Sequence, residues 1–167
     1  RQRYTGEDGI EIMANNSEAD SLISFLIEKG IKPCGLGSRD TLRLEASLPL
    51  YGFELTEDIT PVEASLSWTI TNEHDFLGSD RIKAQLQDGN HKILKKFTID
   101  SRKIARTETI GMSSDIKGVV TSGNFSPILN KSIGFILFEN KPPQNLIEFD
   151  IRGNLIEGNI VNKRFLS

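Results

Sequence analysis

The chain has 167 residues, of which 37% are hydrophobic and 26% are charged, and its formal net charge is -3. This balance is typical of a folded protein and excludes a chain that is disordered throughout. The net charge is too small to indicate a nucleic-acid or membrane-surface partner. A single cysteine excludes an internal disulfide and, with only two histidines beside it, predicts no metal site of the ordinary zinc type.

Charge is unevenly distributed along the chain. Acidic residues outnumber basic ones up to about residue 74, and basic residues are in excess after it. The local pattern changes at the same place, so the sequence predicts a boundary between two structural units there. Chance drift of surface charge is the alternative.

Helical signals dominate the part before this boundary. Residues 10–13 alternate weakly and predict a short strand. A helix is then predicted from Ser17, where the letters SEAD resemble a capping box, to Gly30. A second helix is predicted over residues 37–47, because apolar residues recur there at helical spacing.

Further local signals follow in chain order. Residues 60–63 (TPVE) combine a capping oxygen, a proline and a glutamate in the positions that open a helix, so they predict a short one. Trp68 and Ile70 predict a strand after it. Residues 79–88 predict one more helix, which Gly89 ends.

After residue 91 the pattern becomes strand-like. The predicted strands cover residues 92–99, 117–122, 133–138, 146–151 and 156–161, separated by clusters of Gly, Asn, Pro and Ser. Several short strands without helical signal predict a small antiparallel barrel or sandwich. With the helices concentrated before the strands, the predicted fold class is α+β.

Three segments carry a resemblance to a known family. They are residues 4–12 (YTGEDGIEI), residues 34–64, which contain GLGSRDTLRLEA, LYG and DITPVEA, and residues 120–127, which contain VTSG and FSP. In this order they resemble the T-protein, the aminomethyltransferase of the glycine cleavage system, over nearly the whole chain. YTGE alone has little specificity, whereas the long GLGSRDTLRLEA segment followed by LYG is highly specific.

The resemblance implies a C-terminal half of such an enzyme. Residues 1–73 would form the C-terminal portion of the folate-binding α+β region, and residues 74–167 a C-terminal antiparallel β-barrel domain. T-proteins carry roughly as much chain again before the YTGE motif, including the aspartate that assists the chemistry. The resemblance therefore places no catalytic residue in this fragment.

The reaction of the family moves a one-carbon unit from an aminomethyl group on the lipoyl arm of H-protein to tetrahydrofolate and releases ammonia. The resemblance implies tetrahydrofolate as cofactor, lipoylated H-protein as partner, and neither a nucleic-acid nor a membrane partner. It implies the bacterial cytoplasm, or the mitochondrial matrix if the source is eukaryotic. We expect the fragment itself to be inactive and to bind folate weakly, because a cavity that lacks a wall leaves ring surface in water.

Three residues are candidates for folate binding by resemblance. Glu11 would read the pterin, since its two acceptor oxygens can bind an amino group and a ring N–H on one edge; a solvated glutamate on a strand is the alternative. Arg39 would hydrogen-bond to or stack on the folate, with a helical ion-pair network as the alternative. Tyr4 would line the folate cavity, with a packing role as the alternative.

Neighbouring residues have structural expectations. Asp40, Arg43 and Glu45 are expected to hold the second helix against its neighbours. Gly6 is expected to permit a turn and close approach. Residues 121–123 are expected to form a tight barrel turn without a chemical role.

Two other functions are compatible with the motifs. One is the C-terminal folate-binding domain of a related enzyme, such as sarcosine or dimethylglycine dehydrogenase or a sulfonium demethylase. The other is a non-enzymatic folate-binding protein that supports iron–sulfur clusters. Those proteins carry KGCYxGQE, whereas the counterpart here, residues 74–80 (HDFLGSD), lacks the Cys and the Gln-Glu.

Overall fold

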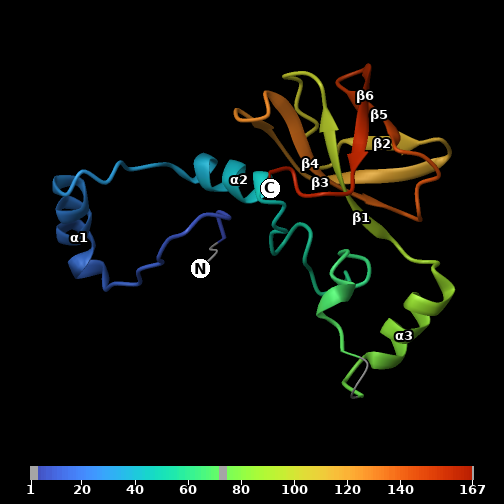
Figure 1. Ribbon diagram of the computed structural model, residues 1–167, viewed down its shortest axis with the longest axis horizontal. Coiled ribbons are helices and arrows are strands. Elements are labelled where there is room, and N and C mark those ends of the chain that lie inside the picture. Colours follow the sequence, from blue (N-terminus) through green and yellow to red (C-terminus); the bar gives the residue numbers. More distant parts are fainter. Residues whose placement is uncertain (1–3, 72–74, 167) are drawn as a thin grey trace.

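The computed structural model describes residues 4–71 and 75–166, in which helices precede a barrel of strands (Figure 1). The helices are α1 (Asn16–Glu28), α2 (Leu36–Glu45) and α3 (Ser79–Asp88), with a short 3-10 helix, η1, at Ser67–Thr69. The strands are β1 (Ile93–Ile99), β2 (Ile110–Ser113), β3 (Ile116–Ser126), β4 (Lys131–Phe138), β5 (Leu146–Ile151) and β6 (Asn154–Val161). The predicted α+β class with a C-terminal antiparallel barrel is confirmed.

The barrel closes in the order β1-β4-β3-β2-β5-β6, and every neighbouring pair is antiparallel. Its core contains Phe97 and Phe149, whose rings are tilted with centroids 4.6 Å apart. Gly111 and Gly118 pair across β2 and β3, and a Cβ on either would come within 2.8 Å of Ile136 Cδ1. Glycine at both positions therefore gives this core side chain its space.

Helix α2 packs against the outside of the barrel through its C-terminal half. It contacts β3 and β4, and Leu44 is fully buried in a cluster with Leu94, Ile133 and Phe135. The buried Glu45 carboxylate accepts a short hydrogen bond from the Ser126 hydroxyl on β3. The expected role of Glu45 in holding this helix against its neighbours is confirmed.

Helix α1 stands away from the barrel (Figure 1), and none of its residues is buried. The predicted helix is confirmed, and Gly30 follows its end with a φ of 83°. The predicted capping box is wrong, because Ser17 lies inside the helix and Asn15 is the N-cap. Asn15 Nδ2 instead donates to Glu18 Oε2 at 3.1 Å.

The capping box at residues 60–63 does form. The Glu63 N–H donates to Thr60 Oγ1 at 3.2 Å, and the Thr60 N–H donates to Glu63 Oε2 at 2.8 Å. The helix that it should open does not form, because Ser65 takes a left-handed φ of 58° after a single turn. Its hydroxyl donates to the Leu94 carbonyl of β1 at 2.7 Å, which ties this turn to the barrel.

Two predicted strands are wrong. Residues 10–13 are exposed and form no strand, and residues 67–69 form η1 where a strand was expected. Both predictions rested on a few apolar residues, and Met13 and Trp68 are in fact largely exposed.

The helix at α3 and the five predicted strands of the barrel are confirmed, whereas β2 was not predicted. The boundary predicted between residues 73 and 74 falls outside the described residues and stays a prediction.

Candidate functional site

A cavity of about 580 Å³ opens beside the N-terminal half of α2. The segments around it are the N-terminal turn, α2, the turn after residue 49, the loop before β2, and β3. Its lining residues are Tyr4, Leu36, Arg39, Asp40, Arg43, Leu50, Phe53, Arg106, Thr107, Ser122 and Gly123. Two of the three predicted folate-binding residues, Tyr4 and Arg39, therefore share one cavity.

Arg39 and Tyr4 contact each other in this lining. Arg39 Cζ lies 4.7 Å from the centroid of the Tyr4 ring, a cation–π distance. The Tyr4 hydroxyl donates to the Pro49 carbonyl at 3.1 Å. Burial raises the pKa of Tyr4, an effect that Arg43 opposes and Glu54 reinforces. Tyr4 is thus held by a hydrogen bond at its hydroxyl and by the Arg39 guanidinium over its ring.

Gly6 allows the turn that carries Tyr4 to lie close to the end of α2. Its φ is 80°, a left-handed conformation that side chains rarely adopt. A Cβ at this position would overlap with the Cβ of Ala46, which follows α2. The expectation that Gly6 permits a turn and close approach is confirmed, and the approach is to the protein's own helix.

Arg43 joins three parts of the fold beneath the cavity. Its side chain is buried and donates from Nε to Asp40 Oδ1 at 2.9 Å, from Nη1 to Glu54 Oε2 at 3.1 Å, and from Nη2 to Ser122 Oγ at 2.8 Å. These acceptors come from α2, the turn after residue 49, and β3. The expectation that Asp40 and Arg43 hold the helix against its neighbours is confirmed.

Glu54 is the buried counter-charge of this arginine. It is 0% exposed, and its Oε2 also accepts from the Leu50 N–H at 2.9 Å. Its other oxygen, Oε1, has no hydrogen-bond partner among the described residues. A buried carboxylate oxygen without a donor is destabilising. The ion pair with Arg43 offsets the cost of burying this charge.

Two family models match the chain in sequence. The model for the GCVT N-terminal domain matches residues 1–74, and the model for the glycine cleavage T-protein C-terminal barrel domain matches residues 92–166. The chain belongs to the glycine cleavage T-protein family. The resemblance of the three sequence segments is thereby confirmed, and the match over residues 92–166 coincides with the closed barrel.

Curated relatives and a solved structure support the same assignment. The aminomethyltransferases of Thermosipho melanesiensis and Bacillus mycoides are 43% and 41% identical to this chain, and each alignment covers 99% of it and 46% or 48% of the relative. The crystal structure of glycine cleavage system aminomethyltransferase T from Bartonella henselae matches with a TM-score of 0.78 and 26% identity, over 90% of this chain and 44% of that one. The chain thus spans about half the length of the curated relatives it matches.

Glu11 lies apart from the cavity in this T-protein chain. It belongs to an exposed segment between the first turn and α1, and it is not among the lining residues. Among the described residues, its carboxylate makes no hydrogen bond or ion pair with Arg39. Its assignment as the pterin-reading residue stays a prediction.

Sequence reasoning missed several residues of the lining. Arg106 and Thr107 come from the loop before β2, and the Thr107 hydroxyl donates to the Thr121 carbonyl at 3.0 Å. Ser122 and Gly123, expected in a tight turn, lie within β3 beside a register shift. Closure of the barrel brings these residues to the cavity. No local sequence pattern predicts that they line it.

Two further features concern metals and membranes. Within the described residues, no group of His, Cys, Asp and Glu side chains could hold a metal ion. In residues 4–71 and 75–166, no helix has the length and apolar character needed to cross a membrane.

Proposed function

We propose that this chain supplies one part of the folate cavity of an aminomethyltransferase. That enzyme would move a one-carbon unit from the aminomethyl group on the lipoyl arm of H-protein to tetrahydrofolate and release ammonia. The observation that carries the proposal is the contact between Tyr4 and Arg39, which come from two separate family motifs and line one cavity. The bacterial cytoplasm, or the mitochondrial matrix of a eukaryote, is the location that goes with this function.

The lining suits a flat ligand that carries carboxylates. Arg39 and Arg106 both line the cavity, and neither has a carboxylate within 4.0 Å among the described residues. A guanidinium can stack on a planar ring or bind a carboxylate through two N–H groups. Folate offers both features, and the cavity volume of about 580 Å³ falls in the range of small-molecule sites.

Each residue then has a distinct task. Tetrahydrofolate, when bound, would supply the nitrogens that accept the one-carbon unit. Arg39 would stack on or hydrogen-bond to it, and Tyr4 would fix the Arg39 side chain from the other side. Glu11 would accept from the donor edge of the pterin. The Arg43 guanidinium already donates to Asp40, Leu48, Glu54 and Ser122, so it would position the helix and leave ligand binding to Arg39.

The cavity is open on one side in this chain. Leu36 and Phe53 line it and remain substantially exposed, and Tyr51 nearby is exposed as well. A bound ring would therefore keep part of its surface in water, which weakens binding. We expect little or no aminomethyltransferase activity from the chain alone.

Calorimetric titration of tetrahydrofolate into the chain tests the cavity. The wild-type chain is expected to bind with a Kd above the micromolar range, and Arg39→Gln to weaken binding by about ten-fold or more, because a charge-assisted contact is lost. Arg152→Gln, an exposed arginine between β5 and β6, is the matched control and should bind as the wild type does.

Equal affinities of the wild type and Arg39→Gln would remove Arg39 from the folate site. Micromolar or tighter binding by the chain alone would contradict the expectation of a missing wall. In a longer version of the protein, Glu11→Ala should weaken folate binding, and an unchanged affinity would remove Glu11 from the site.

A further inference from the structure

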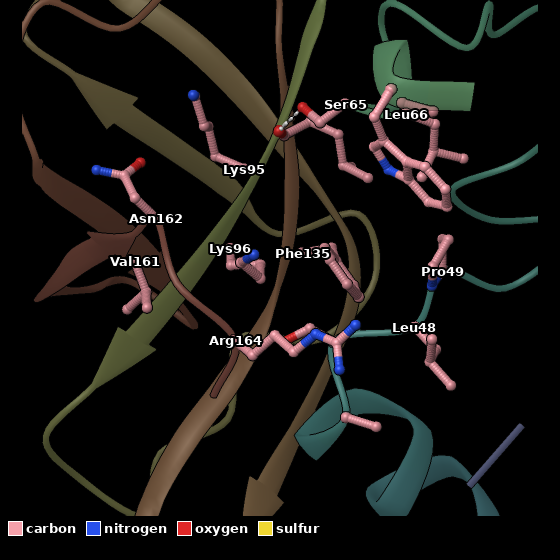
Figure 2. A pocket seen from close by; sticks show the side chains of 15 residues that line it. Leu48, Pro49, Ser65, Leu66, Lys95, Lys96, Phe135, Val161, Asn162 and Arg164 are labelled. Atoms are coloured by element: carbon pink, nitrogen blue, oxygen red, sulfur yellow. Dashed lines mark hydrogen bonds between the residues drawn. The ribbon is translucent and has the colours of Figure 1, made fainter. Parts of the chain in front are cut away.

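A second hollow, of about 360 Å³, lies on another side of the α2–barrel junction (Figure 2). It is bordered by the end of α2, the turn after residue 63, β1, and the chain after β6. It shares no lining residue with the Tyr4–Arg39 cavity. Its walls include the apolar side chains of Leu48, Pro49 and Phe135.

Three cationic residues line this hollow: Lys95 and Lys96 on β1, and Arg164 in the chain after β6. Lys96 is half-buried, whereas Arg164 is exposed at the edge of the hollow. Figure 2 shows the Arg164 side chain pointing toward the side of the hollow where Leu48 and Pro49 lie. Burial lowers the pKa of Lys96 most, and the neighbouring charges of Lys95 and then Arg164 lower it further.

The position of Arg164 is fixed by the residues that follow it. The Phe165 N–H donates to Ser47 Oγ at 3.0 Å, and the Leu166 N–H donates to the Glu45 carbonyl at 3.2 Å. The Phe165 ring also packs against the cluster that contains Leu44. The backbone beside Arg164 is therefore anchored to the end of α2, and this anchor places the Arg164 side chain at the hollow.

Nothing in the described part of the chain neutralises these cations. Neither Lys96 nor Arg164 has a carboxylate within 4.0 Å there, and the groups that act on Lys96 are themselves cations. Cations placed next to the half-buried Lys96 ammonium are unfavourable, and an anion would offset this repulsion. The charges thus favour an anionic occupant, and the walls favour one with an apolar body.

We propose that this hollow binds a small carboxylate with a flat apolar body, such as an aryl carboxylate. The carboxylate would lie between Arg164 and Lys96, where a guanidinium can bind both oxygens. The apolar body would rest against Leu48, Pro49 and Phe135. The volume is at the lower end of small-molecule sites, which limits the body to about one ring.

The single tryptophan makes the proposal directly measurable. Trp68 is the only tryptophan of the chain, lines this hollow, and is 82% exposed. Titration with benzoate is expected to give a saturable change in Trp68 fluorescence and in its indole N–H resonance. Benzamide, which has the same shape without the charge, should bind about ten-fold more weakly or worse.

Matched variants locate the binding. Arg164→Gln and Lys96→Gln should each weaken benzoate binding by about ten-fold, whereas Arg152→Gln and Lys117→Gln, at exposed positions outside the hollow, should leave it unchanged. Retention of the wild-type circular dichroism spectrum shows that each variant is folded. Arg39→Gln should not affect benzoate binding, so this result is independent of the folate proposal.

Three results would overturn the proposal. The first is the absence of any saturable change with benzoate up to tens of millimolar. The second is equal binding of benzoate and benzamide, or unchanged binding by both Arg164→Gln and Lys96→Gln. The third is binding of inorganic phosphate as tight as that of benzoate, since the apolar walls would then contribute nothing.

Discussion

Replacing Arg43 with methionine is expected to lower the free energy of unfolding by about 3–5 kcal/mol, the range for breaking a buried ion pair by removing one partner. Arg43 is 2% exposed and Glu54 is 0% exposed. Without the guanidinium, the Glu54 carboxylate keeps only the Leu50 N–H as a donor, since its Oε1 has no partner among the described residues. Urea unfolding followed by circular dichroism measures the loss through the transition midpoint.

Two further variants separate the charge from the lost packing. Arg81→Met is the matched control, because Arg81 is 62% exposed and lies 3.9 Å from Glu63, so its loss should change stability by at most about 1 kcal/mol. The double variant Arg43→Met/Glu54→Leu should recover much of the stability that Arg43→Met loses, because no buried charge remains. A double variant no more stable than Arg43→Met would show that the loss comes from packing or from the Ser122 contact instead.

The same ion pair shows what the sequence could predict and what it could not. The three-residue spacing of Asp40 and Arg43 on one helix was visible in the sequence, and that contact is present at 2.9 Å. The Ser122 partner, 79 positions along the chain, was not visible, because only the docking of α2 on β3 brings it near. Spacing within a helix is fixed by local geometry, whereas contacts between elements depend on the closed barrel.

Local signals were reliable where a hydrophobic pattern accompanied them. The periodic helix that ends just before Gly30 and the strands β1, β4, β5 and β6 combine runs of apolar residues with turn residues at their ends. They failed where no hydrophobic period accompanied them, even at residues 60–63, where three helix-start signals agreed. The capping box at Thr60 formed without a helix, because Ser65 bonds to β1 instead, and the short β2 with its glycine carried no strand signal. In the cavity, the family motifs identified Tyr4 and Arg39, while Arg106 depended on the path of a barrel loop.

Replacing Phe97 with alanine is expected to lower the free energy of unfolding by about 3–5 kcal/mol, as for other fully buried aromatic side chains. Phe97 is 0% exposed at the centre of the barrel core, and its ring lies 4.6 Å from that of Phe149. The substitution removes this ring pair and leaves a cavity that the closed sheet cannot collapse to fill. Urea unfolding monitored by circular dichroism in the far ultraviolet, where β-structure contributes, measures the loss.

Phe25→Ala on α1 is the matched control. Phe25 is 53% exposed, and no residue of its helix is buried, so the change should stay within about 0.5 kcal/mol. A large difference between the two variants would show that the barrel holds most of the stability of this chain and that α1 adds little to it. Losses of similar size would contradict that conclusion, because they would require Phe25 to be packed against another surface in solution.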